Sequence, residues 1–542
     1  MRAMAPPAPD AAPTSPSRAW APLRRPVFRA IWIAGLLSNL GTWMQNVGAA
    51  WLMTSLAPTP LAVALVQAAS SLPLFLLAIP AGALADVMDR RRLLIGSLVW
   101  LALVTGILGS LALLGAVDPG SLLALTFAIG VGSAFLAPAF LAIGPDLVPR
   151  DEIVSAVSLN GISMNLARAA GPALGGAVVA LAGAGATFLL NGAAFLGLIV
   201  PLARWRRSRR EGRLPPEELI GAMRAGLRFA RHSRPLRIIL ARVANFVLPA
   251  SAVWALLPLY ARQELGLDAA GYGLLLGFFG VGAVAGGFAM PRLQRGLGAQ
   301  GTTTVAGLAY AASHVVLGLA PSLLPAAAAL LAAGAGWLLL LSTLSAAAQL
   351  VLPAWVRARG LSFYLLVLFG SLAIGSAVWG AIAEWVGVPD AFVGAGAAVA
   401  LSRLFVARLH LPEGAGPDLS PAPRWPDPQL AAAFSAERGP VLVTVEYAID
   451  PVDAAAFARA MRELGSIRLR DGALRWGLWA DAAHPGRYLE TFVVESWLEH
   501  LRQHERITAA DRAVQAAAAA FHRGAAPPQV THLVHEEIPV DA

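Results

Sequence analysis

The sequence contains no cysteine and no lysine, and only 13% of its 542 residues are charged. The lack of cysteine excludes disulfide scaffolds, zinc-finger sites and thiol catalysis. A soluble globular protein carries about a quarter charged residues, so half of the usual charge is missing. Hydrophobic residues make up 57% of the chain and the mean hydropathy is +0.64. They stand in long blocks, which excludes a soluble enzyme and indicates a polytopic membrane protein.

The apolar blocks are long enough to cross a bilayer core of about 30 Å. They form six spans, a polar loop and six further spans, so the predicted fold is all-α with twelve transmembrane helices, followed by a small α+β domain. The predicted spans lie near residues 28–54, 61–85, 93–116, 121–144, 154–181, 184–203, 237–261, 270–291, 302–320, 323–349, 360–385 and 390–410. The predicted organisation is a disordered leader (1–23), a six-helix bundle (24–203), a connector with an amphipathic helix (204–236), a second six-helix bundle (237–411), a Pro-rich linker (412–440) and a soluble domain (441–542).

Arginine is concentrated in alternate loops, for example at 24–29, 90–92 and 204–213. The intervening loops carry none, and only Arg262 breaks the pattern. By the positive-inside rule, both termini are predicted to be cytoplasmic. The net charge of +9 therefore orients a multi-pass protein in the cytoplasmic membrane, with the lipid bilayer as its partner, and predicts no nucleic-acid binding.

An offset of 204 residues aligns landmarks of the two six-span groups. The aligned residues are Gly82 with Gly286, Gly130 with Gly334, Gly132 with Gly336, Pro149 with Pro353, Gly171 with Gly375, and Gly176 with Gly380. The offset indicates a duplicated six-helix unit. Two such repeats are a recurring transporter architecture, with the substrate site between the halves near the middle of the membrane.

The region 441–542 follows a βαββαβ pattern, which predicts a ferredoxin-like domain. Its apolar strand residues exceed what two short helices can cover, and such a patch usually marks an interface. The residues are Val443, Val445, Trp476, Leu478, Phe492 and Val494. We therefore expect this domain to pair two copies of the chain as a homodimer; the alternative is that these side chains form the core of a single copy.

A polar loop after the second span reads Gly82-Ala83-Leu84-Ala85-Asp86-Val87-Met88-Asp89-Arg90-Arg91-Arg92. Asp86 at a helix end can face the positive N-terminus of another helix, and Arg90 can reach an acid such as Asp146. Together these groups would form a latch that holds one access state; the alternative is an ordinary basic loop. The loop resembles the signature of the major facilitator superfamily, although Val87 and Asp89 depart from it.

The fifth span contains Gly171, Pro172, Gly175 and Gly176 as Gly-Pro-x-x-Gly-Gly. Proline removes a backbone hydrogen bond and kinks the helix, while glycine allows close helix packing. The element resembles the signature of the superfamily's exporters, the drug and metabolite antiporters. This resemblance implies protons as the coupling ion. The resemblance does not identify the residue that carries the proton, since Thr126 stands where proton-linked members often have Arg.

Candidate substrate-contacting residues lie on spans that line the central cavity in this superfamily. They are Asn39, Trp43 and Asn46 on one helical face, Asn245 and Trp254 in the seventh span, and Arg168 in the fifth. The asparagines can bind substrate or hydrogen-bond between helices. Arg168 can attract an anionic substrate or pair with a carboxylate such as Asp146.

Residues 24–411 resemble the major facilitator superfamily, in the branch of the enterobactin exporter and the transmembrane secretion effectors. Residues 441–540 resemble the dimeric α+β barrels of antibiotic-biosynthesis monooxygenases, which include enzymes and binding modules. His500 and His504 have the spacing of a metal pair without an evident third ligand, so we expect two solvated histidines. No metal, cofactor or catalytic residue is predicted, and enzymatic activity of this domain stays open.

The resemblance implies a secondary transporter that exports an amphipathic small molecule, siderophore-like or drug-like, by proton-coupled alternating access. The alternatives are an importer or sensor on the same fold, and a transporter fused to an enzymatic tail.

Overall fold

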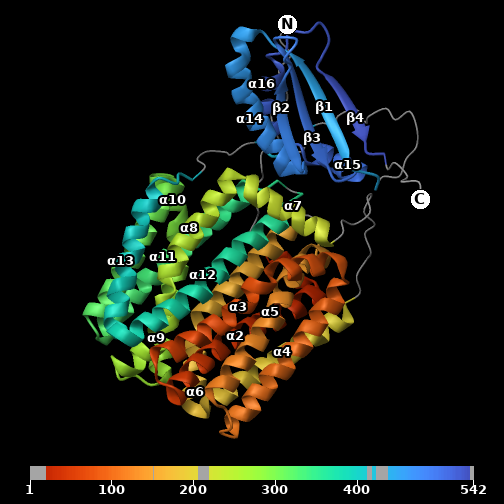
Figure 1. Cartoon of the computed structure of the whole chain (residues 1–542). Helices are drawn as coiled ribbons and strands as arrows, with labels where there is room; N and C mark the ends of the chain where they lie inside the picture. Colours follow the sequence, from red (N-terminus) through yellow and green to blue (C-terminus); the bar gives the residue numbers. More distant parts are fainter. Residues whose placement is uncertain are drawn as a thin grey trace, which may run out of the picture.

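The computed structural model describes residues 20–149, 152–205, 219–353, 355–411, 418–420, 422 and 437–536, apart from the side chains of residues 83, 85–87, 141–142, 144–146, 219–220 and 222. It consists of a large helical body and a smaller domain of strands and helices at one end of it (Figure 1). We call residues 437–536 the tail, the adjoining end of the body the tail side, and the opposite end the far side.

The first half of the body is built from long helices whose starts are fixed by proline and by side-chain caps. The elements are η1 (Ala21–Arg24), α2 (Pro26–Leu56), α3 (Pro60–Val87), α4 (Arg90–Leu113), α5 (Pro119–Leu147) and α6 (Ile153–Arg204). The side chains of Thr59, Asp89 and Asp118 accept hydrogen bonds from the first turns of α3, α4 and α5. Such caps satisfy N–H groups that have no partner within a helix.

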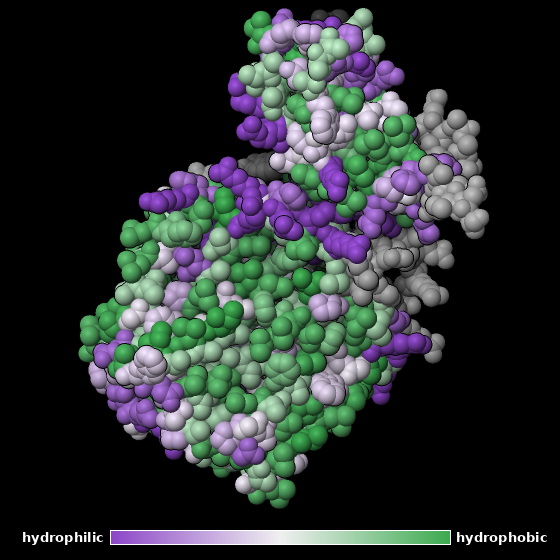
Figure 2. Space-filling model, in the orientation of Figure 1, coloured by the Kyte–Doolittle hydropathy of each residue, from purple (hydrophilic) through white to green (hydrophobic). Residues whose placement is uncertain are grey.

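The second half repeats this design after a short connector helix, α7 (Leu219–His232). Its elements are α8 (Arg234–Ala250), α9 (Ala252–Gln263), α10 (Ala269–Leu319), α11 (Leu323–Leu350), α12 (Arg357–Val386) and α13 (Val388–Ala407). Figure 2 shows apolar residues over the flank of the body and a band of hydrophilic residues between body and tail. This distribution fits a membrane-spanning body with a tail outside the bilayer.

Nine helices among the described residues are long and apolar enough to cross a membrane. Two of them, α6 and α10, have 52 and 51 residues, and a helix of about 50 residues is roughly 75 Å long, more than twice the thickness of a bilayer core. Each is broken by a glycine with non-helical backbone angles, Gly183 (φ 78°) and Gly298 (φ 65°). Both breaks fall between predicted spans. The predicted first span lies in α2, which is not among the nine, so the count of twelve stays a prediction.

Two pairs of glycines related by the 204-residue offset have equivalent contacts in the two halves. A Cβ at Gly171 would meet α2, and one at Gly375 would meet α8. A Cβ at Gly176 would collide with α10 of the other half, and one at Gly380 with α3 of the other half. These pairs support the repeat. They also show that the two halves touch along α6 with α10 and along α3 with α12.

The tail contains a four-stranded antiparallel sheet with helices on one face. Its elements are β1 (Val441–Ala448), η3 (Pro451–Asp453), α14 (Ala454–Asp471), β2 (Arg475–Ala480), β3 (Arg487–Val494), α15 (Trp497–Arg506), α16 (Ala509–Ala519) and β4 (Gln529–Val534). The strand order is β2-β3-β1-β4, and Ser496 caps α15 by accepting from Glu499 N. The order of strands and helices agrees with the predicted pattern, with one additional helix, α16. The ferredoxin-like classification stays a prediction.

The patch proposed for dimerisation is placed differently from our expectation. Val443, Val445, Phe492 and Val494 are all buried in the tail's own core. The register places these residues on the face that α14 and α15 cover, because Val443 pairs with Phe492 and Val441 with Val494. The interface argued from these residues is therefore wrong, and the homodimer stays a prediction without that support.

Candidate functional site

The two halves of the body meet at a pair of tryptophans. Trp43 of α2 and Trp254 of α9 have ring centroids 6.1 Å apart. Trp254 also packs edge-on against Phe279 of α10 at 5.0 Å and against Trp337 of α11 at 5.6 Å. The structure thus brings together two of the predicted cavity residues, one from each half, in an aromatic cluster that can stack against a ring or an apolar group.

Several polar atoms of the body lack described partners, and one of them belongs to Trp254. Asn245 Oδ1, Trp254 Nε1 and Thr126 Oγ1 are buried and form no hydrogen bond within the described part of the chain. The side chains of Asn39, Trp43 and Asn46 likewise form none with described residues; Asn46 is exposed and the other two are partly buried. Buried polar groups are usually paired, so the buried atoms of Asn245 and Trp254 are candidates for ligand contact. Interhelical hydrogen bonding, the alternative for the asparagines, is not observed among the described residues.

Some other polar side chains within the spans are paired between helices. Gln45, next to Asn46, accepts a hydrogen bond from Asn191 Nδ2 at 2.7 Å and so ties α2 to α6. Arg242 of α8 donates to Gln300 at 2.5 Å and to Thr303 at 3.1 Å. These pairs hold helices together.

Arg168 lies in α6, one turn before the Gly-Pro element. Its side chain is partly buried, and it forms no hydrogen bond or ion pair with any described residue. The side chain of Asp146, its expected structural partner, lies outside the described part. An unpaired cation within a span is costly and usually serves a function. Anion binding by Arg168 and its pairing with Asp146 both stay predictions.

The Gly-Pro-x-x-Gly-Gly element forms the contact between the halves. A Cβ at Gly171 would clash with Trp43 and one at Gly175 with Met44, which fixes α6 against α2. At Gly176 a Cβ would meet the backbone of α10, where Gly273 in turn approaches the carbonyl of Pro172. Only small residues permit such close backbone approach. The element therefore packs α6 against both halves.

The loop after α3 is described only in part. The side chains of Asp86 and Asp146 lie outside the described part, so the predicted latch stays a prediction. Gly82 faces Ser362 of α12, and Arg91 donates to the carbonyls of Leu202 (2.9 Å) and Ala203 at the end of α6. Asp89, which departs from the family signature, caps α4 by accepting from Arg92 N at 3.0 Å.

Arg262, the exception to the arginine pattern, joins the two halves on the far side. Its Nη1 donates to Thr54 Oγ1 at 3.0 Å and to Ser55 Oγ at 2.7 Å, both at the end of α2. The guanidinium lies over the ring of Trp51 at 5.5 Å, and that ring stacks on Tyr272 of α10 at 6.0 Å. Sequence reasoning found Arg262 but gave it no role.

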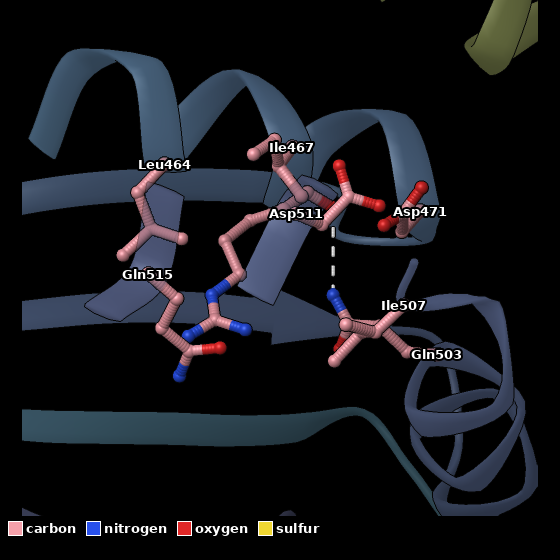
Figure 3. A pocket seen from close by; sticks show the side chains of 8 residues that line it. Leu464, Ile467, Asp471, Gln503, Ile507, Asp511 and Gln515 are labelled. Atoms are coloured by element: carbon pink, nitrogen blue, oxygen red, sulfur yellow. Dashed lines mark hydrogen bonds between the residues drawn. The ribbon is translucent and has the colours of Figure 1, made fainter. Parts of the chain in front are cut away.

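The tail has one small described pocket between α14, α15 and α16 (Figure 3). Arg468, Asp471, Gln503 and Asp511 contribute to its lining. Its free volume of about 10 Å³ holds roughly one water-sized molecule. Burial raises the pKa of Asp471, partly offset by Arg470. This pocket is too small for an organic substrate and gives no support to an enzymatic tail.

The expectation of two solvated histidines on α15 is wrong for His500. Its side chain is buried, its ring lies 4.4 Å from His504 and 4.8 Å from His532, and neither ring nitrogen has a described partner. Burial, together with the neighbouring His504 and His532, lowers the pKa of His500 to about 3. Among the described residues, no group of three or more side chains is arranged to hold a metal ion.

The fold and the junction between two similar halves define a transporter of the major facilitator type, a multi-pass cell-membrane protein. A crystal structure of the nucleoside transporter NupG superposes with a TM-score of 0.59 at 11% identity, covering 71% of this chain and 99% of that one, which shows the shared fold. The chain belongs to the transmembrane secretion effector family, whose family model matches residues 17–540 and so runs through the tail.

Curated relatives are similar over part of their length. The "Staphyloferrin A transporter" of Staphylococcus aureus (strain NCTC 8325 / PS 47) is 32% identical over 157 residues, which are 29% of this chain and 40% of that protein. The "Multidrug efflux pump Tap" of Mycolicibacterium fortuitum is 28% identical over 221 residues, 39% of this chain and 53% of that protein. The chain thus spans about half the length of these relatives.

Proposed function

We propose that the chain is a secondary active transporter that exports an amphipathic small molecule by alternating access. The observation that carries this proposal is the Nε1 of Trp254, whose ring packs against Trp43 where the two halves meet, together with the Oδ1 of Asn245 in α8; neither buried atom has a described partner. Polar groups without partners inside a membrane protein mark substrate pathways.

The chemistry of these residues supports a particular kind of cargo. Trp43 and Trp254 offer an apolar, aromatic surface, Asn245 and Asn46 offer amide groups, and Arg168 offers a positive charge. We infer a molecule that combines a ring or apolar body with amide or hydroxyl groups and a negative charge. The similarity to proteins named for staphyloferrin A transport and multidrug efflux supports siderophore-like or drug-like cargo.

The arrangement of the halves supports alternating access. On the far side the halves are joined by Arg262 with Thr54 and Ser55, and by the close packing of Gly176 on α10. If the tail side is cytoplasmic, as the arginine pattern predicts, this is a state closed to the outside. Proton coupling and the outward direction come from the resemblance to antiporters.

The experiment uses energised inside-out membrane vesicles and a panel of labelled anionic, neutral and cationic amphipathic compounds. An exporter should accumulate at least one compound, and a protonophore should abolish the accumulation. In the variant Arg168→Gln, accumulation of the anionic compounds should fall selectively, and Arg292→Gln is the exposed control. No accumulation of any compound, with accumulation in right-side-out vesicles instead, contradicts export and favours an importer.

A further inference from the structure

The tail is docked on the body through the connector helix α7. The carboxylate of Glu499 on α15 accepts from Arg228 of α7 at 2.8 Å and from Arg506 of the tail at 2.7 Å. The side chains of Arg228, Glu499 and Arg506 are 18%, 11% and 4% exposed. A second, exposed pair joins Arg224 of α7 to Glu495 at 3.2 Å. One buried carboxylate therefore lies between a cation of the connector and a cation of the tail.

Two cation–π contacts extend the interface beyond these ion pairs. The guanidinium of Arg506 lies 4.8 Å from the ring of Trp355, in the segment between α11 and α12. The guanidinium of Arg470, on α14, lies 5.6 Å from the ring of Phe229 on α7. Phe229 and Trp355 pack edge to face at 5.8 Å. Each of these two arginines of the tail thus faces an aromatic ring outside the tail, and such contacts strengthen when they are desolvated.

The connector helix touches both halves of the body. Gly226 of α7 lies against Arg359 and Phe363 of α12, and α7 also contacts α3 of the first half. The sequence predicts an amphipathic helix in this connector. The structure buries Ala225, Phe229 and Ala230 of α7 against the body and presents Arg224 and Arg228 to the tail. Figure 1 shows α7 between the tail and the helical body.

We propose that the tail is a docked clamp that restrains the two halves in the arrangement seen here, with Arg228, Glu499 and Arg506 as its fastening. Rocking of the halves moves α3 relative to α12, and α7 touches both. A contact made in one arrangement and lost in another shifts the equilibrium toward the first. Release of the tail therefore favours the arrangement that is open on the far side.

The test uses the full chain in nanodiscs, and the cysteine-free sequence makes labelling clean. One pair of spin labels, at Val452→Cys and Leu297→Cys, reports the distance from tail to body; the second, at Leu114→Cys and Trp385→Cys, reports opening on the far side. All four positions are exposed. The clamp is broken by Arg228→Glu. The matched control is Arg231→Glu, which changes the charge of α7 equally at an exposed position away from the ion pairs.

In Arg228→Glu the tail distance should broaden, and the population open on the far side should rise about threefold or more. Arg231→Glu should change neither distance. If the distance distribution between tail and body stays narrow in Arg228→Glu, the ion pairs do not fasten the tail. If that distribution broadens but the opening on the far side is unchanged, the tail does not restrain the two halves. Equal effects of both variants likewise overturn it, because they indicate a general charge effect.

The exposed pair gives a milder test that does not disturb the buried carboxylate. Arg224→Glu alone should broaden the tail distance slightly, and adding Glu495→Arg should restore it. Failure of the double variant to restore the distance contradicts docking by charge pairing at this face.

Discussion

The helical body and the tail treat buried polar groups differently. In the tail, the buried carboxylate of Glu490 accepts from Trp476 Nε1 at 3.0 Å, Arg468 Nε at 3.2 Å and the Tyr447 hydroxyl at 3.2 Å. In the body, Asn245 and Trp254 keep buried polar atoms without described partners. A fully satisfied network specifies a fold, whereas an unsatisfied site between two moving halves is suited to a ligand. The comparison holds for Glu490 on one side and for Asn245 and Trp254 on the other.

The largest expected effect comes from breaking the satisfied network in the tail. Glu490→Ala leaves Arg468 as an uncompensated buried charge, which costs about 3–5 kcal/mol. Hydrogen exchange of the β1 and β3 amides in the full chain measures the loss. The control Glu446→Ala removes an exposed pair with Arg487 and should change exchange little. Similar exchange in the two variants would contradict the view that the buried network stabilises the tail.

The second largest effect is expected from removing the positive charge of Arg168 in the candidate binding site. Arg168→Gln should lower the transport of anionic compounds about tenfold, which corresponds to about 1.4 kcal/mol of transition-state stabilisation. Transport of neutral compounds should persist, because the amide and aromatic groups remain. Initial rates in vesicles of matched protein content measure the change, with Arg292→Gln as an exposed control. Unchanged transport of anionic compounds would contradict anion binding by Arg168 and favour a structural role.

His500 and Gln503 are exceptions within the tail, because each has buried polar atoms without described partners. Of the two, His500 titrates and gives the tail a pH dependence. Its folded pKa of about 3 lies below the ordinary value of 6.5, so the unfolded tail binds more protons between these values. Stability contributed by neutral His500 is therefore present above pH 6.5 and is lost as the pH falls toward 3, by up to about 1.4 kcal/mol per pH unit. Hydrogen exchange at several pH values measures this, and His500→Gln should flatten the slope. An equal slope in the variant would assign the dependence to other groups.

The smallest effect is expected at the far side of the body. Arg262→Gln removes the cation that joins α9 to the end of α2, and partly exposed contacts of this kind contribute about 1 kcal/mol or less. The distance between spin labels at Leu114→Cys and Trp385→Cys should gain a longer component. No change would show that helix packing alone closes this side.

Local patterns predicted much of the fold, and long-range contacts account for what they missed. The apolar blocks predicted long apolar helices, and nine helices among the described residues are long and apolar enough to cross a membrane. The 204-residue offset predicted a repeat, which is supported by the contacts of Gly171, Gly375, Gly176 and Gly380. Alternation along the tail predicted its strands but not which face the helices cover, so Val443 and Phe492 were assigned to an interface instead of a core. The burial of His500 arises from packing of α15 on the sheet.

The sequence predicted which residues belong to the candidate site better than it predicted which of them contact one another. Trp43 and Trp254 were expected in one cavity on the basis of family resemblance, and the structure places them together. The role of Arg262 depends on Thr54 and Ser55, which are about 200 residues away in the sequence. No spacing rule reports a contact of that kind. The only sequence signal for this contact was that Arg262 lies at a position where the charge pattern predicts no arginine.

Protection of a single cysteine tests the central claim, that the unpartnered groups between the halves bind the cargo. In Asn245→Cys, alkylation by N-ethylmaleimide should be slowed severalfold by a compound that the vesicles accumulate, because a bound molecule covers this position. Val452→Cys, on the exposed surface of the tail, should react at the same rate with and without the compound. Equal alkylation of Asn245→Cys in both conditions, in a variant that still transports, would contradict the account.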